Sequence, residues 1–292
     1  MSLPELSTPI RIYWDITPVP LVHADHLKIA EYIIALKILN LDIAVTGESI
    51  PDSCFTIIKK CSEARIGITL TVSAAFFTKL LAESLSTAPP KELLLEITSI
   101  EEIFSLDYTH PAVSGFSFPI NENNWKQIPD LIHFVSEKGI KRLVFPMQRL
   151  YSGEHPFHLP AQGIVSISDA LSSLSPAPLL QITAHDPFVW RAIFPNTPFP
   201  NGRCQAANTM LYIDPKGVVY PCPVMPVPIG DLQITTLKEI AKGVIKRELR
   251  AKLLKLPADC IGCEMAESCK GGCRGRGEII SGSWDGIDPA CK

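Results

Sequence analysis

The chain has 292 residues, of which 46% are hydrophobic and 20% are charged, and its formal net charge is −3. This composition is ordinary for a protein with a full hydrophobic core, and the length suggests one large or two modest domains. The balance of charge gives no reason to expect nucleic acid as a partner. No apolar run approaches the ~20 residues of a membrane span, and the N-terminus does not resemble a signal peptide. We therefore expect a cytoplasmic protein that does not enter the membrane.

The first half of the chain predicts strands and helices in alternation. Six such repeats are typical of parallel βα units. Right-handed crossovers would curl the sheet into an open barrel, with a doubly wound sheet as the alternative. The predicted strands are residues 11–17, 42–46, 66–72, 92–98, 112–118 and 142–145, and the predicted helices are residues 23–41, 54–64, 76–85, a short helix from Glu101, and residues 124–138.

The pattern is looser beyond Pro146, and a proline-rich stretch predicts a linker near residues 195–202. We therefore expect one domain over residues 1–195 and another over residues 196–292. The turn sequence Asp214–Gly217 between two apolar segments predicts a hairpin. The elements expected in this half are helices over residues 166–174, 188–194 and 235–254, and strands over residues 179–183, 210–213 and 218–220.

Cysteines gather at the C-terminal end of the chain, where seven of the nine follow residue 203. Thiols this dense, in a chain without secretory features, indicate a metal site rather than disulfides. Glycines among them would let backbone N–H groups approach the sulfur atoms. Structural zinc is the alternative to iron–sulfur clusters, but only Cys260 and Cys263 have the C-x2-C spacing of a zinc knuckle. The seven are Cys204, Cys222, Cys260, Cys263, Cys269, Cys273 and Cys291.

Their spacing is C-x12-G-x4-C, a gap, C-x2-C-x5-C-x3-C, a gap and a last cysteine. This pattern resembles the SPASM domain, the auxiliary iron–sulfur module at the C-terminus of many radical S-adenosylmethionine (SAM) enzymes. The flanking sequences agree over roughly residues 200–292. They are Leu211-Tyr-Ile-Asp-Pro-Lys-Gly-Val-Val-Tyr-Pro-Cys222, Ile229-Gly-Asp-Leu232, Leu237-Lys-Glu-Ile240 and Pro257-Ala-Asp-Cys260.

The resemblance implies two [4Fe–4S] clusters with interleaved ligands. One would be held by Cys260, Cys263, Cys269 and Cys291, and the other by Cys204, Cys222 and Cys273. Family members often carry one more cysteine just before the first, but residues 200–203 contain none. The fourth position of the second cluster would then be open, or taken by a non-cysteine ligand, a substrate or a partner. A [2Fe–2S] cluster, or none, is the alternative there.

The first half resembles a radical SAM barrel that lacks its defining site. Such barrels begin with a strand similar to Tyr13–Thr17, followed by three cysteines in the pattern C-x3-C-x2-C. Here no cysteine precedes Cys54, so the resemblance implies that SAM is not a cofactor. The segment Thr46–Ser49 resembles a decayed form of the glycine-rich segment that binds SAM. We expect a partial (βα)6 radical-SAM-like barrel followed by a small iron–sulfur domain.

Other polar residues have a structural interpretation. Asp25 lies at a predicted helix start and is expected to cap it, with His23 and His26 solvated rather than binding metal. Cys54 and Cys61 are seven residues apart, on one helical face, and are expected in the core. His185-Asp186 is interpreted as a turn. Two loop histidines and one basic helix are interpreted as exposed surface: His155 and His158, and Lys246, Arg247, Arg250, Lys252 and Lys255.

Together these features predict a metal-binding accessory protein with a role in electron transfer or substrate binding beside a radical SAM enzyme, in peptide modification. The chain most resembles the SPASM-domain protein of the GeoRSP system, which implies a radical SAM partner and a PqqD-type peptide-binding protein or precursor peptide. An independent redox enzyme, with its substrate at the barrel mouth, is one alternative. A zinc-binding interaction protein is the other. No triad, carboxylate pair or phosphate loop identifies catalytic residues.

Overall fold

The computed structural model describes residues 6–17, 25–47, 49–106, 108–150, 153–172, 179–197 and 204–291. Its internal contacts divide the chain into two compact units. These units interleave along the sequence, and the predicted domain boundary between residues 195 and 196 stays a prediction. Unit 1 comprises Met1–Leu95, Thr109–Val113 and Gln205–Ala251, and unit 2 comprises Glu96–Tyr108, Ser114–Cys204 and Lys252–Lys292.

A mainly parallel sheet forms the centre of unit 1. Strand β1 pairs in parallel with β2 on one side and with β8 on the other, so that Tyr13 lies opposite both Asp42 and Tyr212. Antiparallel pairs join β8 to β9 and β9 to β10. The order is β10-β9-β8-β1-β2-β3-β4, and the strands are β1 (Arg11–Ile16), β2 (Asn40–Val45), β3 (Gly67–Ser73), β4 (Glu92–Glu96), β8 (Met210–Ile213), β9 (Val218–Tyr220) and β10 (Gly230–Asp231).

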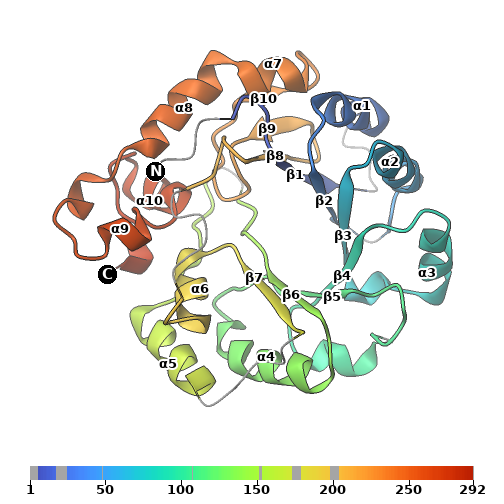
Figure 1. Cartoon of the computed structure of the whole chain (residues 1–292), viewed down its shortest axis with the longest axis horizontal. Coiled ribbons are helices and arrows are strands. Elements are labelled where there is room, and N and C mark those ends of the chain that lie inside the picture. Colours follow the sequence, from blue (N-terminus) through green and yellow to red (C-terminus); the bar gives the residue numbers. More distant parts are fainter. Residues whose placement is uncertain are drawn as a thin grey trace. The chain divides into compact units, whose positions relative to one another are not determined.

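Helices of unit 1 cover one side of this sheet, as α1 and α2 show beside β2 and β3 in Figure 1. The Trp14 ring meets His26 of α1 edge-on with centroids 5.9 Å apart. Since side chains alternate along a strand, Trp14 and its even-numbered neighbours face the helices, and Tyr13 and Asp15 face the other way. The helices are α1 (His26–Leu36), α2 (Asp52–Glu63), η1 (Ala74–Phe76), α3 (Lys79–Ser86), α7 (Leu237–Lys242) and α8 (Val244–Leu254).

Unit 2 contains three further parallel strands and the cysteine-rich end of the chain. Strand β6 pairs in parallel with both β5 and β7, and the helices between them continue the βα alternation. Its elements are η2 (Glu101–Ser105), β5 (Gly115–Ser117), η3 (Trp125–Gln127), α4 (Ile128–Glu137), β6 (Arg142–Phe145), α5 (Ala161–Ser172), β7 (Gln181–Ala184), α6 (Pro187–Ile193), η4 (Ala258–Cys260), α9 (Ala266–Cys269), α10 (Arg274–Ser281) and η5 (Pro289–Cys291). The predicted α/β class with a parallel sheet is confirmed.

Several predicted helices differ from the structure in their bounds; α5, for example, begins at Ala161, five residues before the expected start. The helix expected over residues 23–41 ends at Leu36, because Lys37 is left-handed (φ 55°) and β2 begins at Asn40. The helix expected over residues 235–254 is two helices, interrupted at Gly243, whose φ of −66° and ψ of 159° are extended. Extended backbone cannot continue the helical hydrogen bonds, so α8 starts afresh at Val244.

The interpretation of the basic helix as entirely exposed is also wrong. Lys246 is 1% exposed and Arg250 is 3% exposed, although both lie on α8. The Lys246 ammonium donates to the Leu6 carbonyl at 2.8 Å, and the Arg250 guanidinium donates to the Ala206 carbonyl at 3.3 Å. These two cations therefore join α8 to other segments of unit 1.

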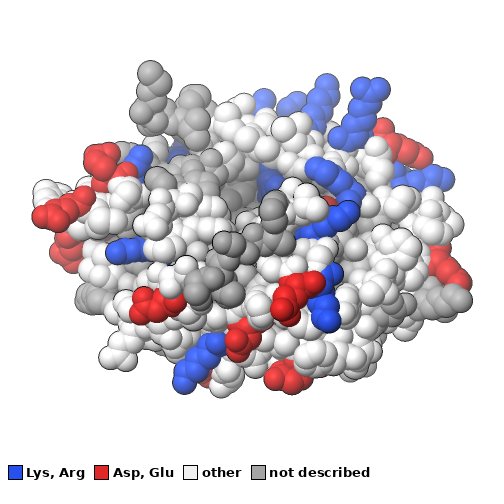
Figure 2. All heavy atoms as spheres, turned by 60° about the horizontal axis from the view of Figure 1, so that its bottom comes forward, with Lys and Arg blue, Asp and Glu red and all other residues white. Residues whose placement is uncertain are grey.

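The charged side chains on the surface and the absence of long apolar helices among the described residues agree with the sequence composition. Acidic and basic side chains both occur across the face drawn in Figure 2. No helix among the described residues is long and apolar enough to cross a membrane.

Candidate metal centre

Four cysteines of unit 2 lie close enough to influence one another, and we call them the quartet: Cys260, Cys263, Cys269 and Cys291. Burial raises the pKa of the Cys260 thiol, and the charges of the other three raise it further. The pKa of Cys291 is raised by burial and then by Cys269 and Cys263. The quartet is the set of cysteines that the SPASM resemblance assigns to one cluster.

Short helical segments present the quartet. Cys260 ends η4, Cys269 ends α9 and Cys291 ends η5. Cys263 and Cys291 are exposed, whereas Cys260 is 8% exposed. In the described part of the chain no three His, Cys, Asp or Glu side chains are placed to hold one metal ion. The quartet is therefore defined by the electrostatic influence of its thiols on one another.

Two glycines shape the backbone around Cys269. Gly271 and Gly272 have φ values of +91° and +62°, which favour glycine. Their backbone N–H groups lower the pKa of the Cys269 thiol, which burial raises. A Cβ on Gly272 would lie 2.7 Å from the Asp288 Cβ, so this backbone also packs too closely for a side chain. The expected approach of glycine N–H groups to a cysteine sulfur is thus present.

Cys273 occupies the N-cap of α10, apart from the quartet. Burial raises the pKa of this thiol to about 12, and the Arg276 guanidinium opposes the rise. Its backbone N–H donates to the Asp288 carboxylate at 2.7 Å. A thiolate at a helix N-terminus is stabilised by the helix dipole. Burial nevertheless keeps this thiol protonated at neutral pH, so a bound metal would have to offset the cost of burying a thiolate here.

A buried ion pair holds the two cysteine segments together. Arg276 and Asp288 are each 2% exposed, and two N–H···O bonds of 2.7 Å join the guanidinium to the carboxylate. Arg276 also contacts the Asp186 carboxylate, at the start of α6. The Asp288 carbonyl accepts from the Cys291 N–H at 2.9 Å. Asp288 therefore fixes Cys273 through its side chain and Cys291 through its backbone.

Sequence reasoning missed this ion pair. Asp186 is read from sequence as part of a turn, and it does cap α6 by accepting from Phe188 and Val189. Its second role depends on Arg276, which lies 90 residues further along the chain. No local pattern predicts such a pairing. The run Cys273-Arg-Gly-Arg-Gly, with two arginines beside a cysteine, is the only signal that pointed here.

The remaining two cysteines lie in different units. Cys204 belongs to unit 2, where it and Cys273 both act electrostatically on Arg274. Cys222 belongs to unit 1, where it is 6% exposed and lies just beyond β9. It contributes to the raised pKa of Tyr13, whose main cause is burial. The candidate positions for a fourth ligand, residues 200–203, lie outside the described residues.

The donor set fits iron–sulfur clusters. Cysteine thiolates are the usual cluster ligands, four for each cluster, and backbone N–H groups near the sulfurs are typical of such sites. The quartet and the glycines beside Cys269 supply both. Arg274 adds a buried guanidinium whose Nε and Nη1 have no hydrogen-bond partner among the described residues. This region can therefore accommodate buried negative charge.

Unit 1 has a polar sheet face of its own, on the side away from α1. Asp15 is fully buried and accepts a 2.9 Å hydrogen bond from the Tyr212 hydroxyl. Arg11 pairs with Asp42 at 3.3 Å. The alternation of polar and apolar residues in β1 is the sequence signal for this face, and sequence reasoning did not use it. Ionisable groups buried together in this way are candidates for substrate binding.

The segment in place of the missing cysteine motif is a capped helix start. The Asp25 carboxylate accepts from the N–H groups of Leu27 and Lys28, so its expected capping role is confirmed. His26 Nδ1 lies 3.1 Å from the Ser53 hydroxyl, so this ring is partly buried rather than solvated. His23 and Glu48 lie outside the described residues.

The two early cysteines are core residues, as expected. Cys54 and Cys61 are fully buried on α2 with Ile57 and Ile58. Burial raises the pKa of Cys54 to about 12 and that of Cys61 to about 11. Both thiols are therefore protonated at neutral pH, which is unfavourable for binding metal.

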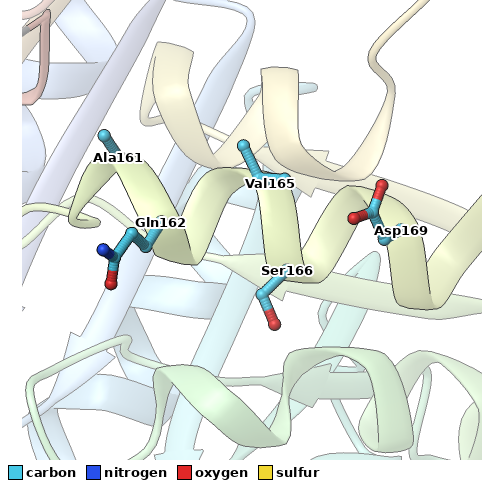
Figure 3. A pocket seen from close by; sticks show the side chains of 5 residues that line it. All are labelled: Ala161, Gln162, Val165, Ser166 and Asp169. Carbon is cyan, nitrogen blue, oxygen red and sulfur yellow. The ribbon is translucent and has the colours of Figure 1, made fainter.

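An open hollow runs along α5, apart from the cysteines. Figure 3 shows the residues that line it projecting from this one helix. Of the loop histidines before α5, His155 is exposed and His158 half-buried. The hollow is lined by Ala161, Gln162, Val165, Ser166 and Asp169. It carries one carboxylate and no cysteine, and we assign no function to it.

Comparison with known proteins agrees with this geometry. Residues 204–264 match the SPASM family model, described as an iron–sulfur cluster-binding domain. No curated protein matches the sequence. SuiB from Streptococcus suis has a TM-score of 0.71 and 15% identity, over 99% of this chain and 78% of that chain. SuiB bound to precursor peptide SuiA has a TM-score of 0.66 and 14% identity, over 99% and 77%.

A second solved protein has the same fold. It is anSMEcpe, crystallised with bound AdoMet and a Cp18Cys peptide, with a TM-score of 0.68 and 15% identity over 96% of this chain and 94% of that chain. The chain thus shares the α/β fold of SuiB and anSMEcpe, and its residues 204–264 match the SPASM model. The seven assigned ligands and their division between two clusters stay predictions, as does the resemblance to the GeoRSP protein.

Proposed function

We propose that this chain is an iron–sulfur accessory protein in peptide modification. It would carry clusters on a radical-SAM-like fold that has no SAM-cleaving site of its own. The observation that carries the proposal is the quartet, four mutually interacting cysteines of which Cys260 and Cys263 lie in the matched cluster-binding segment. The buried Arg276–Asp288 pair supports it, because rigid anchoring of ligand segments is what a cluster site needs.

The quartet would hold one cluster, and Cys204, Cys222 and Cys273 would hold the other. Bound clusters would supply one-electron transfer. The residues of the chain have separate tasks: the thiolates bind, the N–H groups of Gly271 and Gly272 offset negative charge at Cys269, and Asp288 orients the segments. The open position beside Cys204, Cys222 and Cys273 would suit a peptide thiolate or a partner's ligand.

The partner would be a radical SAM enzyme. No cysteine lies between β1 and α1, and the first two cysteines of the chain are buried on α2, so the chain itself has no thiolates for a SAM-binding cluster. SuiB has been crystallised with a precursor peptide and anSMEcpe with a peptide. These fold relatives support a peptide as substrate, as does the resemblance to a system with a PqqD-type peptide-binding protein.

The polar face of unit 1 favours a second candidate function, an independent redox enzyme. The buried pair Asp15–Tyr212 and the pair Arg11–Asp42 lie on the side of the sheet away from α1. Ionisable groups at such a place can bind a polar substrate. Electrons from the clusters would then serve a reaction in this chain alone.

Anaerobic purification, with iron, sulfide and zinc analysis, tests the first part of the proposal. We expect iron and sulfide in near-equal amounts, up to about eight irons per chain if both clusters are [4Fe–4S]. A reproducible single zinc without iron would support the zinc-binding alternative. EPR with and without SAM, and an assay for 5′-deoxyadenosine, test the second part. Formation of 5′-deoxyadenosine by this chain alone would overturn it.

Co-purification with the cognate radical SAM enzyme separates the accessory role from the independent one. We expect a stable complex and a rate of peptide modification that depends on this chain. An unchanged rate without it would contradict the accessory role. The Asp15→Asn variant, which keeps the volume of the side chain, should leave that rate unchanged if the polar face has no part in the reaction.

A further inference from the structure

The most unusual side chain near the cysteines is Arg274, the first residue of α10. It is 2% exposed, so its guanidinium is removed from water almost completely. Only its Nη2 donates, to the Trp284 carbonyl, while Nε and Nη1 have no hydrogen-bond partner among the described residues. A buried cation with unused donors is costly, because nothing replaces the water that it has lost.

Arg276 lies two residues further along α10, and carboxylates compensate the charge of its guanidinium. It is equally buried, but it is paired with the carboxylates of Asp288 and Asp186. The carboxylate that acts on Arg274 is that of Asp285, an exposed residue. The two arginines therefore share a helix and a degree of burial, and differ in their anionic partners.

The groups whose ionised forms act on Arg274 are mainly cysteines. Burial lowers the pKa of its guanidinium, and Cys204, Cys260, Asp285 and Cys273, in decreasing order, oppose that lowering. Cys260 belongs to the quartet, whereas Cys204 and Cys273 belong to the other proposed cluster. One guanidinium is thus within electrostatic reach of ligands from both sites, and all of these residues lie in unit 2.

We propose that Arg274 is a positioning residue shared by the two cluster sites, supplying positive charge and the N–H donors of Nε and Nη1 to cluster sulfurs on either side. This inference rests on the proposed function. Clusters with thiolate ligands are anionic, and their potentials respond to net charge and to hydrogen bonds at sulfur. A nearby cation stabilises the reduced form, which carries one more negative charge, and so raises the reduction potential.

The same arrangement couples the two sites. In the cluster-free protein, Arg274 is a poorly compensated charge, and the first cluster to be inserted supplies its counter-charge. Its side chain is then held where the second site needs it. Arg274 should therefore stabilise the loaded protein and not the cluster-free one, which is the opposite of what a purely structural arginine does.

Arg274→Gln tests the proposal, with Arg247→Gln on the exposed part of α8 as the matched control. The readouts are the midpoint potential by EPR-monitored titration, iron per chain, and Tm before and after reconstitution. We expect a lower potential, by about a tenfold change in the redox equilibrium or about 59 mV for one electron. We also expect less iron per chain, a lower Tm for the reconstituted variant, and an unchanged or higher Tm for the cluster-free variant.

Arg274→Lys separates charge from donor geometry, and it serves if Arg274→Gln does not fold. The Arg274→Lys variant should have a midpoint potential close to that of the wild type, because it keeps the charge. It should bind less iron per chain, because an ammonium cannot present the fixed fork of a guanidinium. The role of Arg274 would be overturned if the midpoint potential, the iron content and the Tm of Arg274→Gln all equal those of the wild type and of Arg247→Gln. That result would leave the proposed function intact. A wild-type chain that takes up no iron would instead overturn the proposed function.

Discussion

The buried carboxylate of Asp288 offers the sharpest test of how the cysteine segments are held. It accepts two 2.7 Å bonds from Arg276, one of 2.7 Å from the Cys273 N–H and one of 3.1 Å from the Ala290 N–H. Asp288→Asn keeps the volume but removes the charge, and it turns one acceptor into an NH2 group. At either oxygen position that group would face one guanidinium N–H of Arg276 and one backbone N–H, from Ala290 or from Cys273.

The expected cost follows from these contacts. Removal of one partner of a buried ion pair costs about 3–5 kcal/mol. Here Asp186 still contacts Arg276 and the asparagine keeps one acceptor oxygen, so we expect the lower end, about 3 kcal/mol. The loss of one hydrogen bond to a charged acceptor costs about 1.5–3 kcal/mol, which is in the same range.

Urea unfolding of the cluster-free chain, followed by circular dichroism, measures this loss as a lower midpoint at an unchanged slope. Asp169→Asn on the exposed side of α5 is the control, and we expect its effect to stay within about 0.5 kcal/mol. After anaerobic reconstitution, Asp288→Asn should also bind less iron. A loss no larger than that of the control would refute the reasoning, because the ion pair would then not anchor these segments.

The remaining predictions concern individual residues. Cys273→Ala should lower the iron content by about half and leave the EPR signal of the quartet cluster, since its thiol is assigned to the other cluster; loss of both signals would contradict this assignment. Cys54 and Cys61 should resist iodoacetamide at pH 8 in the folded chain and react on unfolding, because burial raises their pKa values to about 12 and 11. Peptide mass spectrometry measures this, and rapid labelling of the folded chain would argue against their burial. The same shifts predict that stability falls above about pH 9, where unfolded thiols ionise first. Gly272→Ala should cost more than about 1 kcal/mol in urea unfolding, because φ is +62° and the new Cβ would lie 2.7 Å from the Asp288 Cβ; Gly282→Ala, at a φ of +69° with open space around the Cβ, is the control that isolates the clash.

Elements with strong local signals could be read from sequence. The hairpin of β8 and β9 has the predicted bounds, because the turn residues between its strands act over a few positions. Strand β6 and the cap at Asp25 are of the same kind. The break at Gly243 was missed, because an isolated glycine is tolerated in many helices.

What the sequence by itself determined is the chemistry: thiolate spacing typical of iron–sulfur ligands, and no cysteine where a SAM-binding cluster would need three. Spacing carries this information because metal ligands come from short, local segments. What only the tertiary structure decided is how charge is compensated around those thiols. Arg276 pairs with Asp186, which lies 90 residues earlier in the chain. Arg274, two positions before Arg276, is buried among cysteines. Both are arginines beside a cysteine in the sequence, and their different partners follow from the face of α10 that each occupies when the segments pack.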